Sequence, residues 1–169
     1  MKILVTGCAG LIGSAAVELF DGLGFTIVGL DNNGRQEYFG PEGSTIWNLT
    51  KLHKNCKNFT SMKLDICNKE GIDYLFSKNK FDVICHFAAA PAHDYSFRNP
   101  YRDFQVNTIG TVNLLEATRL YNPDALFIFT STSKVYGVNV NDYAMVEKET
   151  RYSYFNSFMI GVRESCSID

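Results

Sequence analysis

The chain has 169 residues, of which 46% are hydrophobic, 20% are charged and 14% are aromatic. A chain of this length buries roughly 70% of the surface that its unfolded form exposes, which excludes a disordered tail or a disulfide mini-protein and predicts one compact domain. The formal net charge is −2 and the sequence has no block of Lys or Arg. We therefore expect a small molecule as the partner, and not a nucleic acid or an anionic membrane.

The cysteines and the N-terminus indicate the cellular location. The cysteines at positions 8, 56, 67, 85 and 166 form no C-x-x-C pair, which is typical of free thiols in a reducing compartment. Glycines interrupt the apolar N-terminal stretch, and no apolar run reaches the length of about 18 residues that a membrane span needs. The sequence predicts a cytoplasmic protein without a membrane span.

Short apolar runs alternate with stretches of helical periodicity. Strands are expected at 2–6, 25–30, 59–64, 81–87 and 125–129, and helices near 12–23, 69–77 and 101–121. This alternation predicts an α/β fold, a doubly wound parallel Rossmann sheet in the order 3-2-1-4-5 with helices on both faces. Residues 31–58 are expected to form a long polar loop with a short helix around 44–53. Beyond residue 137 few runs favour a further strand.

A glycine turn joins the first strand to the first helix. Gly7, Gly10 and Gly13 follow the pattern Gly-x-x-Gly-x-x-Gly, and Leu11 and Ile12 lie at the start of the helix. This setting is typical of a dinucleotide-binding fingerprint: Gly7 permits the tight turn, Gly10 lets a pyrophosphate approach the backbone, and Gly13 allows close packing of helix on strand. The helix N-terminus would present N–H groups and partial positive charge to the phosphates. An ordinary glycine turn is the alternative.

Two aspartates follow the second and third strands. Asp31 lies 18 residues after Gly13, where its carboxylate can accept both ribose hydroxyls of adenosine and repel a 2′-phosphate, which favours NAD over NADP. Asp65 is placed to accept a hydrogen bond from the adenine amino group. A turn residue is the alternative for each aspartate.

The glycine spacing and further motifs resemble the extended short-chain dehydrogenase/reductase family, whose members act on nucleotide sugars. The further motifs are Asp31-Asn32, Asp65-Ile66, His86-Phe87-Ala88-Ala89-Ala90, Asn107-Thr108-Ile109-Gly110-Thr111 and Thr130-Ser131-Thr132-Ser133-Lys134-Val135-Tyr136-Gly137. The resemblance covers residues 1–137. Within this family, residues 33–48, 91–94 and 131–137 are most similar to the CDP-paratose (CDP-tyvelose) 2-epimerases.

The resemblance implies NAD as cofactor and a role for each motif. Thr132 is implied as the catalytic residue that hydrogen-bonds the substrate hydroxyl, Asn107 as the residue that fixes the long helix against the loop after the fourth strand, and His93 as a substrate contact. His86 is expected in the core, and no spacing of the three histidines suits a metal. The implied cofactor-binding residues are Gly7, Gly10, Leu11, Ile12, Gly13, Asp31, Asn32, Asp65, Ile66, Phe87, Ala88, Ala89, Ala90 and Asn107.

In this family NAD⁺ takes a hydride from a sugar carbon and returns it to the other face, and the proton is handled by a Tyr four residues before a Lys. No Tyr after Thr132 is followed by Lys at that distance, and residues 161–169 resemble the stretch that precedes this motif. The expectation is therefore a truncated chain with an NAD-binding Rossmann domain at 1–137 and an extension at 138–169. The sheet would be incomplete on its C-terminal side, the substrate domain would be absent, and catalysis would be weak or lost.

Several functions stay open on the sequence alone. A CDP-paratose 2-epimerase-like enzyme is favoured, and the alternatives are a UDP-sugar 4-epimerase, a nucleotide-sugar 4,6-dehydratase, an inactive NAD-binding module and a structural protein with a vestigial pocket. The dehydratases need an acidic residue beside the Ser/Thr, which Ser133-Lys134 does not provide. The expected partners are a CDP- or UDP-sugar and, in a full-length form, a second copy of the chain in a homodimer.

Overall fold

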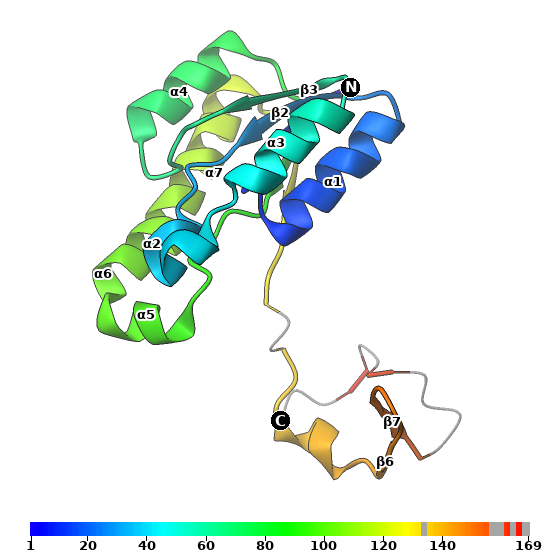
Figure 1. Cartoon of the computed structure of the whole chain (residues 1–169). Coiled ribbons are helices and arrows are strands. Elements are labelled where there is room, and N and C mark those ends of the chain that lie inside the picture. The colour runs from blue at the N-terminus through cyan, green and yellow to red at the C-terminus, as the bar shows by residue number, and fades with distance from the viewer. Residues whose placement is uncertain (133–134, 156–160, 163–164, 167–169) are drawn as a thin grey trace. The chain divides into compact units, whose positions relative to one another are not determined.

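The structure is a computed structural model that describes residues 1–132, 135–155, 161–162 and 165–166 (Figure 1). Ser133 and Lys134, and most of the stretch 161–169 compared with the family above, lie outside the described residues. The chain divides into two compact units, residues 1–130 and 131–169. The domain boundary expected after residue 137 stays a prediction.

Five parallel strands form the sheet of the first unit. They are β1 (Lys2–Thr6), β2 (Thr26–Leu30), β3 (Phe59–Met62), β4 (Val83–His86) and β5 (Leu126–Phe129). Their order is β3-β2-β1-β4-β5, which confirms the doubly wound parallel sheet predicted from the sequence. Since parallel strands all end at the same edge, the loops after β1, β2, β3 and β4 meet there.

Helices cover both faces of this sheet (Figure 1). On one face lie α1 (Leu11–Gly22) and α3 (Ile46–Asn55), and on the other lie α4 (Lys69–Lys78) and α7 (Gly110–Tyr121). The helix predicted over 101–121 is one continuous run, in which α6 (Pro100–Phe104) passes through the π-helical turn η2 (Gln105–Ile109) into α7. Among the described residues, no helix combines the length and the apolar character that crossing a bilayer requires.

The strands send alternate side chains into two apolar layers. One layer contains Leu4 and Ile84 of the strands with Leu114 of α7, and the other contains Ile3 of β1 with Val17 of α1. All five side chains are at most 1% exposed. Burial on both faces explains why β1 and β4 are nearly continuous apolar runs in the sequence. The strands are thus packed on both faces, and they fix the positions at which the loops of the carboxyl edge begin.

Residues 31–58 are not the long loop that their polar composition predicts. The short helix α2 (Arg35–Phe39), the 3₁₀ turn η1 (Gly40–Gly43) and α3 occupy most of this segment; α3 confirms the helix expected around 44–53. Asn33 adopts a left-handed φ of 59°, accepts a hydrogen bond from the Thr45 backbone N–H at 2.7 Å and donates to Gln36 Oε1 at 2.6 Å. Such side-chain bonds fold a segment without leaving any apolar periodicity in the sequence.

Several further elements of the described residues were not expected. The helix α5 (His93–Arg98) follows β4. In the second unit the 3₁₀ turn η3 (Val138–Asp142) precedes an antiparallel hairpin of β6 (Met145–Glu147) and β7 (Tyr152–Tyr154). The sequence analysis expected few runs that favour a strand beyond residue 137 and did not locate this hairpin, because strands of three residues are too short to show an alternating pattern.

Candidate dinucleotide-binding site

A cavity of about 320 Å³ opens at the carboxyl edge of the sheet. It lies where the segments after β1, β2, β3 and β4 meet, which is the topological switch point at which doubly wound folds bind their ligands. Its volume is in the range of small-molecule sites. Most of the predicted cofactor-binding residues line it: Gly7, Gly10, Leu11, Ile12, Gly13, Asp31, Asn32, Asp65, Ile66, Phe87, Ala88 and Ala89.

Close backbone contacts explain why two of the three positions in the turn after β1 are occupied by glycine. Gly7 has a φ of +66°, and a Cβ added there would lie 2.9 Å from the Ala88 backbone nitrogen. A Cβ on Gly13 would lie 2.1 Å from the Gly7 carbonyl oxygen, whereas one on Gly10 would meet the same oxygen at 3.2 Å. Gly7 and Gly13 therefore let three backbone segments approach one another, and a side chain at either position would push the cavity wall apart.

The first turn of α1 fits a phosphate-bearing ligand with an apolar part. The helix has 12 residues and begins at the cavity, so its N-terminus directs partial positive charge there. Leu11 and Ile12 line the same cavity, yet their exposed fractions are 89% and 55%. A ligand bound against this turn would cover apolar surface that the protein itself leaves open.

Asp31 fastens two walls of the cavity to each other. Its Oδ2 accepts a hydrogen bond from the Ala9 backbone N–H in the glycine turn at 3.0 Å. Its Oδ1 accepts from the Asn33 N–H at 2.8 Å and from Thr45 Oγ1 at 3.3 Å. An ionised carboxylate offers about four acceptor positions, so roughly one is left for a ribose hydroxyl. Binding both hydroxyls, as predicted, requires the long bond from Thr45 to give way.

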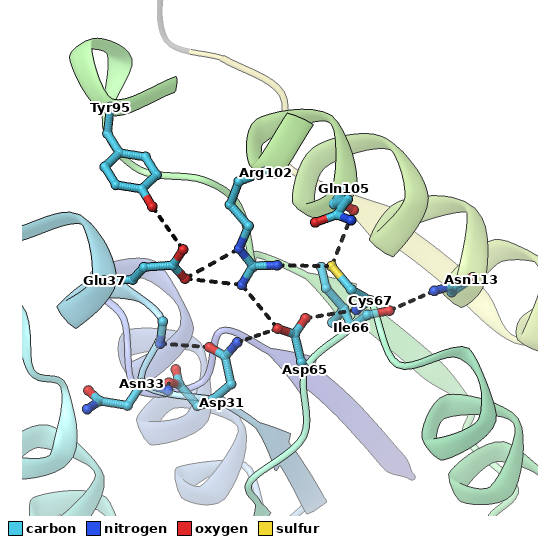
Figure 2. A network of polar contacts seen from close by, with 12 residues as sticks. Asp31, Asn33, Glu37, Asp65, Ile66, Cys67, Tyr95, Arg102, Gln105 and Asn113 are labelled. Atoms are coloured by element: carbon cyan, nitrogen blue, oxygen red, sulfur yellow. Dashed lines mark hydrogen bonds and ion pairs between the residues drawn. The ribbon is translucent and has the colours of Figure 1, made fainter. Parts of the chain in front are cut away.

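The Asp65 carboxylate also accepts hydrogen bonds from other protein groups (Figure 2). It accepts hydrogen bonds from Asn32 Nδ2 at 2.9 Å, from the Cys67 backbone N–H at 2.8 Å and from Arg102 Nη2 at 3.2 Å. Burial opposes ionisation, but the bonds from Cys67 and Arg102 outweigh it and hold the pKa of Asp65 below its ordinary value. The carboxylate thus stays charged, and about one acceptor position remains for the predicted contact with an adenine amino group.

Arg102 of α6 ties α2 to the rest of the site (Figure 2). Besides Asp65, it donates from Nε and Nη2 to Glu37 Oε2, each at 3.3 Å. The Tyr95 hydroxyl of α5 donates to the other oxygen of Glu37 at 2.9 Å. Burial opposes charging of Arg102, but its two carboxylate partners prevail and raise its pKa. These bonds hold α2 against α5 and α6 beside the cavity.

His86 supports the wall that follows β4. It is 1% exposed, which confirms the predicted core position, and burial lowers its pKa to about 4. Its Nδ1 lies 2.8 Å from Thr6 Oγ1 and its Nε2 lies 2.9 Å from Thr111 Oγ1. The Thr6 hydroxyl oxygen in turn accepts bonds from the N–H groups of Phe87 and Ala88, both at 3.2 Å. A buried polar chain therefore fixes the backbone at the cavity.

Four predicted residues are not part of the described cavity lining. Asn107 Oδ1 accepts a bond from the Ala90 N–H at 2.9 Å, which is the predicted link between the long helix and the loop after β4. His93 lies in a second, more open cavity and its side chain is 86% exposed. Thr132 follows β5 in the second unit. Contacts of Ala90 and Asn107 with cofactor, and of His93 and Thr132 with substrate, stay predictions.

The structure adds lining residues that the sequence analysis missed. Arg35 and Tyr38 come from α2, Thr45 precedes α3, and Arg102 comes from α6. The search for motifs at the ends of strands could not find them, since none of them directly follows a strand. The charge of Arg102 is complementary to those of Asp65 and Glu37, but these partners lie 37 and 65 residues away in the chain, so no local pattern predicts the contact.

Comparison with known proteins places this site in a family. Residues 4–155 match the family model described as GDP-mannose 4,6 dehydratase. The chain belongs to this family of NAD-dependent epimerases and dehydratases, which confirms the resemblance found from the motifs.

Two curated relatives and one solved structure that this chain resembles are epimerases. The chain is 37% identical over 153 residues to CDP-paratose 2-epimerase from Salmonella typhi, covering 90% of this chain and 43% of the relative. It is 38% identical over 136 residues to UDP-glucose 4-epimerase from Pisum sativum, covering 80% and 38%. The crystal structure of UDP-glucose 4-epimerase from Bifidobacterium longum in complex with NAD⁺ and UDP is similar with a TM-score of 0.68 and 26% identity, covering 82% of this chain and 39% of that one. The chain thus spans about two fifths of the length of these proteins.

Proposed function

We propose that this chain is the NAD-binding part of a nucleotide-sugar epimerase of the CDP-paratose 2-epimerase type. One observation carries the proposal: the glycine turn, Asp31 and Asp65 line a single cavity at the switch point of the sheet. Similarity to a solved epimerase with bound NAD⁺ supports the same cofactor here. Bound NAD⁺ supplies a hydride acceptor for the transient oxidation of a sugar hydroxyl.

The chain's own residues bind and orient the dinucleotide in this proposal. The turn at Gly7–Gly13 and the N-terminus of α1 hold the pyrophosphate, because close backbone approach and a positive helix end both favour it. Asp31 accepts from the adenosine ribose and excludes a 2′-phosphate by its charge, and Asp65 with Ile66 holds the adenine. Phe87 to Ala89 form the wall that the Thr6 and His86 hydrogen bonds fix.

A cytidine diphosphate sugar is the proposed substrate. The match to the CDP-paratose enzyme extends over 90% of this chain, against 80% for the UDP-glucose enzyme from Pisum sativum. Thr132 is proposed to contact the reacting hydroxyl and His93 another part of the sugar nucleotide. We propose a cytoplasmic location and a homodimer for the full-length form, with a boundary near residue 137 between the NAD-binding domain and the following extension.

A second candidate is an NAD-binding module without sugar turnover. It is favoured by one sequence observation: after Thr132, no Tyr is followed four residues later by Lys within these 169 residues. A positioned acid–base group contributes about 10²- to 10⁴-fold to such a reaction. The two candidates share the cofactor site and differ in turnover.

Calorimetric titration of the 169-residue protein with NAD⁺ and with NADP⁺ tests the cofactor site. We expect saturable one-to-one binding of NAD⁺ and much weaker binding of NADP⁺. Folded protein that releases no heat with NAD⁺ would refute the proposal. Sugar turnover then separates the candidates in a longer form of the chain that includes a Tyr four residues before a Lys: epimerisation of a CDP-sugar by that form supports the enzyme, and NAD⁺ binding without epimerisation supports the module.

A further inference from the structure

The two oxygens of the Asp65 carboxylate are occupied unequally. Oδ2 accepts hydrogen bonds from Asn32 Nδ2 at 2.9 Å and from Arg102 Nη2 at 3.2 Å, whereas Oδ1 accepts from the Cys67 backbone N–H at 2.8 Å (Figure 2). The Cys67 thiol donates to the Gln105 carbonyl oxygen at 3.3 Å. Each oxygen of an ionised carboxylate offers about two acceptor positions, so Oδ2 is filled and Oδ1 keeps one position for a ligand.

A ligand in the cavity can reach the Asp65 side chain. Asp65 lines the proposed dinucleotide cavity, and its side chain is 30% exposed. The remaining position on Oδ1 accepts a hydrogen bond from a donor such as the 6-amino group of adenine. A carbonyl oxygen at the same place would face a negatively charged acceptor and could form no hydrogen bond with it. The carboxylate can therefore distinguish an amino group from an oxo group on a base.

Arg102 fixes the orientation of this carboxylate from another helix. The last torsion of an aspartate side chain has only broad preferences, so the partners of Oδ2 decide where Oδ1 points. Arg102 of α6 is the charged partner, and a charge-assisted bond holds more strongly than the neutral one from Asn32. The Arg102 side chain is 23% exposed, but Nε and Nη2 donate to Glu37 Oε2, each at 3.3 Å, and Nη1 lies 3.7 Å from Cys67 Sγ. The guanidinium is thus directed at protein groups and acts on a base through Asp65.

The same contact keeps Asp65 ionised. Burial opposes ionisation, but the bonds from Cys67 and Arg102 prevail and hold the pKa of Asp65 below its ordinary value. At neutral pH the carboxylate has no proton to donate to an oxo group, so it can only accept.

From this geometry we infer that Arg102 is a positioning residue for base recognition: by holding Asp65 Oδ2 it directs Oδ1 at the 6-amino group, and so makes the site select adenine over hypoxanthine. The inference rests on the proposed function, since it takes a dinucleotide as the occupant of the cavity and Asp65 as its contact with the base. It adds base selectivity to the site and assigns it to a residue on α6, outside the motifs that follow the strands.

Nicotinamide hypoxanthine dinucleotide tests the inference, because it differs from NAD⁺ only at the base, where an oxo group replaces the 6-amino group. We expect the unaltered protein to bind NAD⁺ at least about 10-fold more tightly than this analogue in calorimetric titrations, the range of one charge-assisted hydrogen bond. Arg102→Met should reduce the ratio of the two affinities to about 3-fold or less, because the carboxylate is then free to turn. Arg119→Met on α7, which breaks an exposed pair with Glu116, is the matched control and should keep the ratio. A cavity that is merely loosened would weaken both ligands equally, so the ratio reports on the base contact and not on stability.

Each contrary result has a distinct meaning. A ratio in Arg102→Met equal to that of the unaltered protein would overturn the inference and leave the proposed function intact. Equal binding of the two dinucleotides by the unaltered protein would refute the contact of Asp65 with the base, and the inference with it, while NAD⁺ binding itself would stand. If Arg102→Met does not unfold cooperatively, Arg102→Gln, which keeps a hydrogen-bond donor without the charge, takes its place with the same expected fall in the ratio. Unaltered, folded protein that bound no NAD⁺ would refute the proposed function itself.

Discussion

Asp31 combines a structural task with a proposed binding task. Three protein groups donate to its carboxylate, one of them from the glycine turn and two from the segment after β2. The residue proposed to select the cofactor therefore also sets the spacing of the cavity walls. A change at Asp31 should alter stability and cofactor preference together.

We predict that Asp31→Asn lowers both stability and NAD⁺ affinity. Asparagine keeps the shape, but its amide N–H₂ would face a backbone N–H of Ala9 or Asn33, and its neutral side chain no longer repels a 2′-phosphate. A charge-assisted hydrogen bond contributes about 1.5–3 kcal/mol, which corresponds to a loss of about 10- to 100-fold in NAD⁺ affinity. Calorimetry should show a smaller difference between NAD⁺ and NADP⁺. The exposed Asp124→Asn is the control, and an unchanged ratio of the two affinities would contradict the assigned role.

The hydrogen bonds of His86 define its tautomer. The Thr111 hydroxyl donates its proton to the Asn107 carbonyl oxygen at 2.7 Å, so it can only accept from His86 Nε2–H. Nδ1 is then the acceptor of the Thr6 O–H, since the Thr6 oxygen already accepts from Phe87 and Ala88. A proton on Nδ1 would face a hydroxyl oxygen with both of its acceptor positions filled. The neutral ring is thus the form that the fold requires.

We predict that stability declines in mild acid because of His86. Burial lowers its pKa from 6.5 to about 4, so between these values the unfolded chain takes up a proton that the folded chain does not. The free energy of unfolding is therefore undiminished above pH 6.5 and falls as the pH drops towards 4, by up to about 3 kcal/mol. Urea unfolding at a series of pH values measures this slope. His86→Gln should flatten it, and an equal slope in that variant would assign the effect to other groups.

Side chains that follow strands could be predicted from the sequence, and those that depend on distant partners could not. Gly7, Gly13, Asp31 and Asp65 line the cavity because their places in a β–turn–α pattern are fixed by local chain geometry. Arg102 enters the same cavity through partners that lie 37 and 65 residues away in the chain. No local pattern encodes such a contact.

At the scale of elements, the turn between β1 and α1 depends on the absence of a side chain at Gly13. We predict that Gly13→Ala abolishes NAD⁺ binding and destabilises the fold strongly, because the new Cβ would lie 2.1 Å from a backbone oxygen. Gly22→Ala, at the end of the same helix, is the matched control. There, within the described structure, nothing lies within 4 Å of the added Cβ, and the gain in helix propensity is about 0.5–1 kcal/mol. Thermal unfolding and calorimetry compare the two, and a stable Gly13→Ala that binds NAD⁺ would contradict the close approach.

The attachment of α2 to α6 depends on one cation between two carboxylates. We predict that Arg102→Met lowers the free energy of unfolding by about 1–2 kcal/mol, between the values for exposed and buried ion pairs, since Arg102 is half-buried. It should also raise the pKa of Asp65, for which Arg102 is a favourable partner. Urea unfolding and an NMR titration of Asp65 measure these effects. Arg119→Met on α7, which breaks an exposed pair with Glu116, should change little, and equal losses in both variants would count against the special role of Arg102.

The predicted elements differ from the observed ones where tertiary contacts replace local pattern. All five strands and the long helices were found because burial on defined faces leaves apolar runs or helical periodicity. The helix α2 has five residues with no buried side chain, and its bonds run to Arg102 and Tyr95. Helices this short are unstable alone, so their existence depends on partners that the local sequence does not reveal.

At the scale of the whole molecule, the proposed cofactor site and the proposed sugar chemistry belong to different parts of the chain. Among the residues that the structure describes, those lining the cavity lie between Gly7 and Val106, inside the unit of residues 1–130. Thr132, the proposed contact of the reacting hydroxyl, lies in the unit of residues 131–169. Cofactor binding and substrate chemistry should therefore be separable by experiment.

We predict that residues 1–130 alone fold and bind NAD⁺ with the affinity of the 169-residue protein. This fragment contains both apolar layers and the Arg102 network, so the contacts that shape the cavity are all retained. Urea unfolding should stay cooperative, and calorimetry should give the same dissociation constant within about twofold, a difference of less than about 0.5 kcal/mol. A cooperative fragment that binds NAD⁺ ten times more weakly would show that residues beyond 130 contribute to the site, and would assign them a direct part in holding the cofactor.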